Sequence, residues 1–177
     1  MDAKQLYLLC VSKNGLNEGE VTQLSTQDKA MLEKIGEKYW LKSSERSKFK
    51  VVLTGGVFDI LHIGHMLTLQ KAKEHGDLLV AVVTTDKRVQ EVKKRNPVHK
   101  ADYRRTMVLS IKWVDLAIIG SEKIMDTFER VKPDLVVFGY DQQPFKLPEP
   151  CKSVHLKDVK ADEDFAKTSK IIRELGL

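Results

Sequence analysis

Two patterns of apolar and polar residues run through this chain. From residue 50 onward, five short segments are almost continuously apolar, which is typical of strands covered on both faces of a parallel sheet. The pattern therefore predicts an α/β domain built on a parallel five-stranded sheet. The predicted strands are Val51–Leu53, Asp77–Thr84, Leu116–Ile119, Leu135–Phe138 and Lys152–Leu156.

The segments between these strands carry apolar residues at helical spacing. A strand, a helix and a further strand of these lengths form a right-handed βαβ unit, so we expect helices on both faces of the sheet. The first helix is predicted from Gly64 to the His75-Gly76 pair. The others are predicted over residues 87–92 after a possible Asp86 cap, from Asp102 through Ile111, and from a Ser121 cap through Val131.

The first 49 residues have a weaker pattern. Lys4–Val11 is compatible with a helix or a strand, and Asn17–Leu24 is compatible with a short element. We expect Thr26 to cap a helix that continues through Ile35, and Tyr39–Leu41 to form a strand or an aromatic anchor.

Two interpretations of residues 1–49 stay open. A helix, a turn, a second helix and a short hairpin are the outline of a winged helix, which binds DNA. The segment offers no clearly basic recognition helix, however. The other interpretation is an N-terminal extension that packs on the main domain, residues 50–177, or on a second subunit.

Composition excludes several classes of protein. The chain has 177 residues, 42% hydrophobic and 31% charged, which is ordinary for a globular protein. No apolar run approaches the roughly 20 residues of a membrane span, and the N-terminus does not resemble a signal peptide. Two distant cysteines do not form a disulfide framework, so we expect a cytoplasmic protein. The net charge of +5 agrees with anionic small substrates. It is spread over many lysines and is only weak evidence for nucleic acid, so we do not expect a nucleic-acid partner.

Residues 50–65 carry the most specific chemical signal. A short strand leads into Gly55-Gly56, a pair that permits a tight turn and a close approach of a ligand to the backbone. The following helix begins near His62, Gly64 and His65. A helix N-terminus presents free N–H groups to an anion, so we expect a phosphate there, with the two imidazoles donating hydrogen bonds from either side of Gly64.

A zinc site is an alternative for this histidine pair, because two histidines three residues apart can share a metal ion. Tetrahedral zinc needs further ligands. Cys10 and Cys151 are distant in sequence, and His99 and His155 stand alone. We therefore predict no metal ligand among the protein side chains.

Residues 54–65, Thr-Gly-Gly-Val-Phe-Asp-Ile-Leu-His-Ile-Gly-His, resemble the HxGH signature of the cytidylyltransferase-like nucleotidyltransferases. The resemblance extends from about Lys50 to the C-terminus. It implies a Rossmann-like, doubly wound sheet with the strand order 3-2-1-4-5. Glycerol-3-phosphate cytidylyltransferases and archaeal FAD synthases are two branches of this superfamily.

Other segments resemble the superfamily more loosely. Gly139–Gln142 is similar to its Gly-x-Asp segment, and Arg104 occupies the position of an arginine that precedes the Val-Asp pair. Residues 167–170 resemble its C-terminal phosphate motif, although Lys167 replaces the usual hydroxyl residue. The predicted nucleotide-binding residues are Thr54, Gly55, Gly56, Phe58, Gly64, Gly139, Asp141, Gln142, Thr168 and Ser169, and the predicted substrate-binding residues are Asp59, Asp86, Lys93 and Arg104.

The resemblance implies a reaction in which a phosphorylated acceptor attacks the α-phosphorus of a nucleoside triphosphate and expels pyrophosphate. His62, His65 and Lys170 are the predicted catalytic residues, and Mg²⁺ would accompany the triphosphate. Asp59 would orient the histidines or the metal ion.

The sequence leaves the nucleotide and the acceptor open. Gly139–Phe145 resembles the archaeal FAD synthases more than the cytidylyltransferases, so we favour adenylyl transfer from ATP to FMN. Cytidylyl transfer from CTP to a polyol or sugar phosphate is the alternative within the enzyme class. A nucleotide-sensing regulator with an N-terminal DNA-binding element is the alternative of another class. A homodimer is possible in each case.

Overall fold

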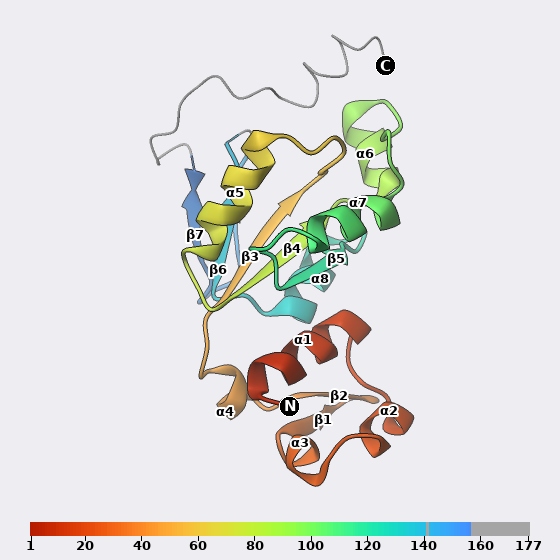
Figure 1. Ribbon diagram of the computed structural model, residues 1–177, viewed down its shortest axis with the longest axis vertical. Helices are drawn as coiled ribbons and strands as arrows, with labels where there is room; N and C mark the ends of the chain where they lie inside the picture. Colours follow the sequence, from red (N-terminus) through yellow and green to blue (C-terminus); the bar gives the residue numbers. More distant parts are fainter. Residues whose placement is uncertain (141, 157–177) are drawn as a thin grey trace.

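The computed structural model describes residues 1–140 and 142–156 of the chain. Five parallel strands form its main sheet in the order β5-β4-β3-β6-β7, which is the predicted order 3-2-1-4-5 in the numbering of the whole chain. The prediction of a Rossmann-like α/β fold is therefore confirmed (Figure 1). The strands are β3 (Val51–Gly56), β4 (Leu78–Val83), β5 (Leu116–Ile119), β6 (Leu135–Phe138) and β7 (Lys152–His155).

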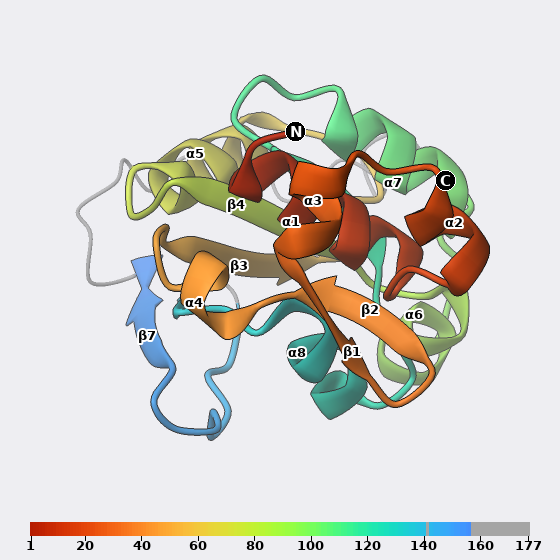
Figure 2. The same ribbon diagram turned by 90° about the horizontal axis from the view of Figure 1, so that it is seen from below.

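Four helices flank this sheet within the described residues. They are α5 (Ile63–Lys73), α6 (Asp86–Lys93), α7 (Ala101–Leu109) and α8 (Ile124–Val131). Helices α5 and α7 lie on one face and α8 lies on the other, as the view from below shows (Figure 2). The predicted Ser121 cap is wrong. Lys123 is the N-cap of α8, and the backbone N–H of Ser121 instead donates to the hydroxyl of Thr127.

Strand positions in the sheet alternate between two apolar clusters. Val52 and Leu79 face the cluster beneath α5 and α7. Val51 and Val80 face the opposite cluster, which also includes residues from the N-terminal part of the chain. Burial on both faces explains why each strand has a nearly continuous apolar sequence.

The N-terminal residues form a separate group of short elements. They are α1 (Ala3–Lys13), α2 (Glu18–Thr22), α3 (Thr26–Ala30), β1 (Leu32–Ile35), β2 (Lys38–Leu41) and α4 (Ser43–Arg46). A capping box between Asp2 and Gln5 favours a helix for the segment that was ambiguous from sequence. The prediction of one helix from Thr26 through Ile35 is wrong, because α3 is capped by Ser25 and the next residues form a hairpin.

Helix α1 packs at the end of the sheet where the parallel strands begin (Figure 1). Leu6, Cys10 and Val11 lie in the same apolar cluster as residues of β3, β4 and β5. The hydroxyl of Tyr7 donates to the carbonyl of Val131, with an O···O distance of 2.6 Å. Residues 1–49 thus lie at the end of the sheet opposite to the ends of β3 and β4 that lead into the ligand-side loops.

The N-terminal elements have the order expected for the winged-helix outline, and an isolated bridge joins Leu16 to Tyr39 of the hairpin. Their charges nearly balance, with eight Lys and Arg residues against seven Asp and Glu residues. Lys34 pairs with Glu18, and Asp28 of α3 binds the N-terminal amine. This charge distribution does not favour a phosphate backbone as a partner. The domain boundary near residue 49 stays a prediction.

No helix within residues 1–140 and 142–156 is both long enough and apolar enough to cross a membrane.

Candidate functional site

The histidine pair lies where the sequence predicts, between the end of β3 and the first turn of α5. His62 is the N-cap of α5, in an extended conformation, and its ring makes no capping bond to the helix. The rings of His62 and His65 stack, with centroids 3.9 Å apart and an interplanar angle of 27°. The expectation that they flank Gly64 from either side is therefore wrong. They form one stacked unit beside the helix N-terminus.

Three residues predicted to contact ligands are instead buried and bound by the protein itself: Thr54, Asp59 and Arg104. The hydroxyl of Thr54 donates to the carbonyl of Val137 and ties β3 to β6. The prediction that these three side chains bind nucleotide or substrate directly needs correction, because their polar atoms already have partners within the fold.

Arg104 is fully buried, at 0% exposure. Its guanidinium donates to the carbonyls of His99, Val57 and Thr84 and to the carboxylate of Asp86. These acceptors come from the loop after β3, the end of β4 and the segment before α7. Arg104 therefore fixes the relative positions of the loops around the site.

Asp59 also fixes a neighbouring segment of the chain through hydrogen bonds. One carboxylate oxygen accepts from the backbone N–H groups of Val98 and His99 at 2.8 and 3.1 Å, and the other accepts from Arg95 at 2.9 Å. No described contact joins the Asp59 carboxylate to the imidazole of His62 or His65. Asp59 therefore fixes the segment at residues 95–99, and its predicted role in orienting the histidines or a metal ion stays a prediction.

Asp86 and Lys93 lie at the two ends of α6. The predicted Asp86 cap is wrong, because Thr85 is the N-cap and its hydroxyl accepts from the N–H of Arg88. Asp86 sits in the first turn and pairs with Arg104 at 2.6 Å. Lys93 is exposed at the start of the basic loop and remains accessible to an anionic ligand.

Gln142 connects the ends of the two central strands. Its amide oxygen accepts from the N–H of Gly139 at 2.8 Å, and its amide nitrogen donates to the carbonyl of Gly55 at 2.5 Å. The structure thus brings the predicted nucleotide-binding residues Gly139 and Gln142 together with Gly55, which is distant in sequence.

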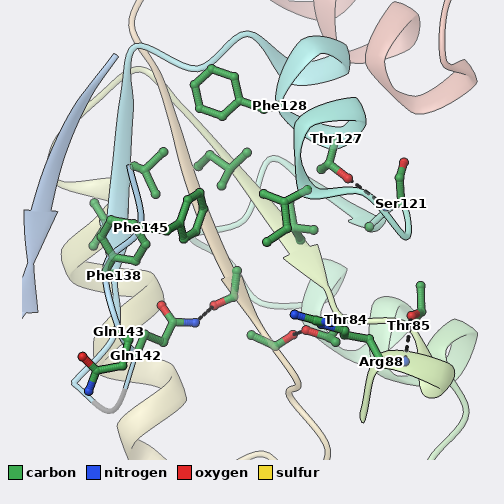
Figure 3. A pocket seen from close by; sticks show the side chains of 18 of the residues that line it. Thr84, Thr85, Arg88, Ser121, Thr127, Phe128, Phe138, Gln142, Gln143 and Phe145 are labelled. Carbon is green, nitrogen blue, oxygen red and sulfur yellow. Dashed lines mark hydrogen bonds between the residues drawn. The ribbon is translucent and has the colours of Figure 1, made fainter. Parts of the chain in front are cut away.

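A cavity of about 330 Å³ opens beside these residues, on the α8 face of the sheet (Figure 3). Gly55 and Gly56 line it, whereas His62 and His65 do not. Its walls are mainly apolar, and the rings of Phe138 and Phe145 meet edge to face with centroids 5.4 Å apart. Thr84, Thr85 and Arg88 lie at one end of the cavity.

Sequence reasoning missed several residues of this cavity. The sequence pattern predicts that Phe128 is a core residue of an amphipathic helix and that Phe138 ends a buried strand. Thr84 directly follows β4, and Ser121 lies two residues after β5. These positions are the available signal in the sequence, because ligands bind at the carboxyl ends of parallel strands.

Four predicted site residues lie outside the described residues. They are Asp141 in the segment after β6, and Thr168, Ser169 and Lys170 in the C-terminal motif.

Within the described residues, no group of three or more His, Cys, Asp or Glu side chains is arranged to hold a metal ion. The site instead combines the N-terminus of α5 and its two imidazoles with an apolar cavity on the α8 face of the sheet. The first two suit phosphate, and the cavity suits a flat, largely apolar ring system.

Comparison with known proteins agrees with this geometry. The sequence model of the cytidylyltransferase-like family matches residues 53–174. The chain is 39% identical to the FAD synthase of Thermococcus sibiricus over 144 residues, which are 75% of this chain and 95% of that protein. It is 44% identical to the FAD synthase of Aciduliprofundum boonei over 131 residues, which are 68% of this chain and 87% of that protein.

A solved structure is also similar. It is the crystal structure of the lipopolysaccharide core biosynthesis protein from Thermoplasma volcanium, with 38% sequence identity and a TM-score of 0.53. The similarity covers 55% of this chain and 80% of that chain.

Proposed function

This chain belongs to the cytidylyltransferase-like family, and from that premise we propose that it is an FAD synthase, which transfers the adenylyl group of ATP to FMN. The observation that carries the proposal is the 39–44% identity to two archaeal FAD synthases over at least 87% of their length. The chain is accordingly a nucleotidyltransferase.

The reaction needs no covalent intermediate with the enzyme. A phosphate oxygen of FMN attacks the α-phosphorus of ATP, a new phosphoanhydride bond forms, the α–β bond breaks, and pyrophosphate leaves. Catalysis of this kind rests on positioning the reactants and stabilising charge.

We assign the triphosphate to the N-terminus of α5. Its free N–H groups favour an anion, and the stacked pair His62 and His65 lies at the same helix turn. Hydrogen bonds from imidazoles to the phosphates would strengthen as charge moves toward the leaving pyrophosphate. Thr168, Ser169 and Lys170 would bind phosphate from the C-terminal motif.

Mg²⁺ is proposed to arrive with ATP. Phosphate oxygens and water are its usual ligands in such sites, together with few carboxylates. Asp59 is engaged by Arg95 and two backbone N–H groups, so the triphosphate itself would supply most of the ligands. The ion would offset charge on the pyrophosphate.

We place the isoalloxazine ring of FMN in the cavity on the α8 face. Its volume of about 330 Å³ lies within the range of small-molecule sites, roughly 300–1,000 Å³, and its apolar walls suit an aromatic ring. Phe128, Phe138 and Phe145 are the aromatic residues that line it. Gly55 and Gly56 line the cavity at the end of β3, the strand that leads to α5. An isoalloxazine ring in the cavity would therefore direct the FMN phosphate toward ATP at the N-terminus of α5.

The alternatives are less well supported. A small polyol phosphate would leave the aromatic walls of the cavity in contact with water, which disfavours the cytidylyltransferase alternative. The near-balanced charge of residues 1–49 disfavours the DNA-binding regulator. We propose that these residues are an extension that stiffens the sheet. A cytoplasmic location is consistent with the free thiols of Cys10 and Cys151, and a homodimer stays a prediction.

A substrate matrix tests the proposal. Pyrophosphate release is measured with ATP or CTP, each combined with FMN or glycerol 3-phosphate, in the presence of Mg²⁺. We expect rapid release only with ATP and FMN. Faster release with CTP and glycerol 3-phosphate would replace this proposal with the cytidylyltransferase alternative, and no release with any pair would favour the regulator.

A further inference from the structure

Phe58 has a backbone conformation that is unusual for a large side chain. Its φ angle is 51°, in the left-handed region. The three other non-glycine residues with positive φ in the described chain, Asn14, Lys94 and Lys132, each cap the C-terminus of a helix, where this conformation is common. Phe58 caps no helix. Strained residues of this kind persist only where the surroundings fix them, and they cluster at functional sites.

The two neighbours of Phe58 are both held by contacts from distant segments. The carbonyl of Val57 accepts from the buried guanidinium of Arg104. The carboxylate of Asp59 accepts from the backbone of Val98 and His99, and its carbonyl lies 3.2 Å from the Nδ1 atom of His99. The residues on both sides of Phe58 are therefore anchored to distant segments, which limits how far the backbone at Phe58 can move.

The constrained backbone places the Phe58 ring in a defined position. The ring is 2% exposed and lies against Gly56, where an added Cβ would come within 2.9 Å of its carbon atoms. Its other neighbour is the His65 ring, with centroids 5.2 Å apart and an interplanar angle of 54°. His65 in turn stacks on His62. Three rings thus form a continuous row that begins in the core and ends at the helix N-terminus.

We propose that Phe58 is a positioning residue that sets the orientation of the His65 imidazole. The inference rests on the proposed adenylyl transfer, in which His65 must align a hydrogen bond with the moving charge. Misplacement of a reacting group by about 1 Å can cost roughly a hundredfold in rate. Arg104 and Asp59 anchor the residues on either side of Phe58, and Phe58 in turn packs against His65, so the buried hydrogen bonds help to position the imidazole.

The test compares Phe58→Leu with Phe49→Leu. Phe49 is a matched control, since it is 6% exposed, contacts an aromatic ring and belongs to the other apolar cluster. We expect Phe58→Leu to lower kcat at least about tenfold, with the KM for ATP changed less than about twofold. Phe49→Leu should lower the melting temperature to a similar degree and leave kcat of the folded protein unchanged. Phe58→Met is the second variant if Phe58→Leu does not fold.

The second readout is the NMR signal of the His65 ring protons, assigned with a His65→Gln variant. Reorientation of the imidazole should weaken the nuclear Overhauser effects between the ring protons of His65 and those of His62 in Phe58→Leu or Phe58→Met and not in Phe49→Leu, because the two rings stack in the wild type. Unchanged Overhauser effects between these rings, or kcat values that fall only as much as in Phe49→Leu, would overturn the proposal. If the wild-type protein forms no FAD, the proposed function fails, and the NMR signals still decide whether Phe58 orients His65.

Discussion

The imidazole rings of His62 and His65 stack at the first turn of α5, with their centroids 3.9 Å apart. Residues three positions apart in a helix lie on the same face, so the HxGH spacing directs both rings to one side. Gly64 leaves the backbone between them without a side chain. The two rings therefore form one stacked unit at the helix N-terminus, which fits the proposal that both bind the same triphosphate.

His65→Ala should lower kcat by about a hundredfold or more, because a preorganised donor to a developing charge contributes roughly 3 kcal/mol. The dissociation constant for ATP should change much less, since the hydrogen bond matters most in the transition state. Steady-state kinetics and calorimetric titration measure the two effects. His75→Ala, at the other end of the same helix, is the control and should retain full activity. A large loss of ATP affinity in His65→Ala would assign His65 to ground-state binding.

Arg104→Ala should unfold at a much lower denaturant concentration than the wild type. Its removal leaves the carbonyls of Val57, Thr84 and His99 without a donor in a buried region, which should cost at least about 3 kcal/mol. Urea unfolding measures this change. Arg105→Ala is the matched control and should stay within about 0.5 kcal/mol of the wild type.

This outcome reverses an expectation from the sequence. Paired arginines in the first turn of a helix suggest an anionic ligand or surface ion pairs, so Arg104 was expected to lie outside the core. Charged residues are rarely buried unless they are paired. Arg104 pairs with the carboxylate of Asp86 and otherwise donates to backbone carbonyls from three separate segments, and carbonyls carry no sequence signature. An Arg104→Ala variant with wild-type stability would contradict the structural role.

Tyr7→Phe should lower stability by about 1–2 kcal/mol, because the buried carbonyl of Val131 loses its donor. Burial raises the pKa of the Tyr7 hydroxyl far above its usual value, so the group stays a donor at ordinary pH. Tyr39→Phe is the control, since its hydroxyl bonds to Glu18 at the surface. Equal effects from both variants would show that α1 is not firmly docked on α8.

A shortened chain that starts at Ser47 removes the whole contact between the N-terminal elements and the main sheet. The apolar cluster shared by α1 and the sheet would be exposed, so we expect a clearly lower melting temperature. Because residues 1–49 lie away from the ligand-side loops, the folded fraction should keep its turnover. Loss of kcat in folded, shortened protein would mean that the extension takes part in catalysis.

Stability should fall as pH rises from 9 toward 11. Burial raises the pKa of the Cys10 thiol to about 11 from its usual 9.0, so over this range the unfolded chain loses a proton that the folded chain retains. The stabilisation is complete below pH 9 and should be smaller by about 1 kcal/mol at pH 10. Urea midpoints at pH 8 and pH 10 measure it. In Cys10→Ala the free energy of unfolding should depend much less on pH than in the wild type. Partial burial also raises the pKa of the Cys151 thiol, so Cys151→Ala is the comparison and should change the pH dependence less.

The sequence predicted the main sheet well and the cavity poorly. Leu116–Ile119 and Leu135–Phe138 were placed at their observed bounds, because burial on both faces produces an apolar run with sharp ends. The cavity combines Gly55, Thr84, Phe128 and Phe145, which come from four separate segments. The pairing of β3 and β4 places Gly55 near Thr84, and the packing of α8 over the sheet adds Phe128. No local sequence pattern predicts that packing.

Labelled ATP tests adenylyl transfer to FMN most directly. The protein is incubated with FMN, Mg²⁺ and ATP that carries ³²P at the α-phosphorus. We expect the label to appear in FAD and unlabelled pyrophosphate to be released in equal amount, with at least about a hundredfold less product from His65→Ala. Label that stays in ATP, or appears in AMP or ADP without FAD, would show that the chain does not synthesise FAD.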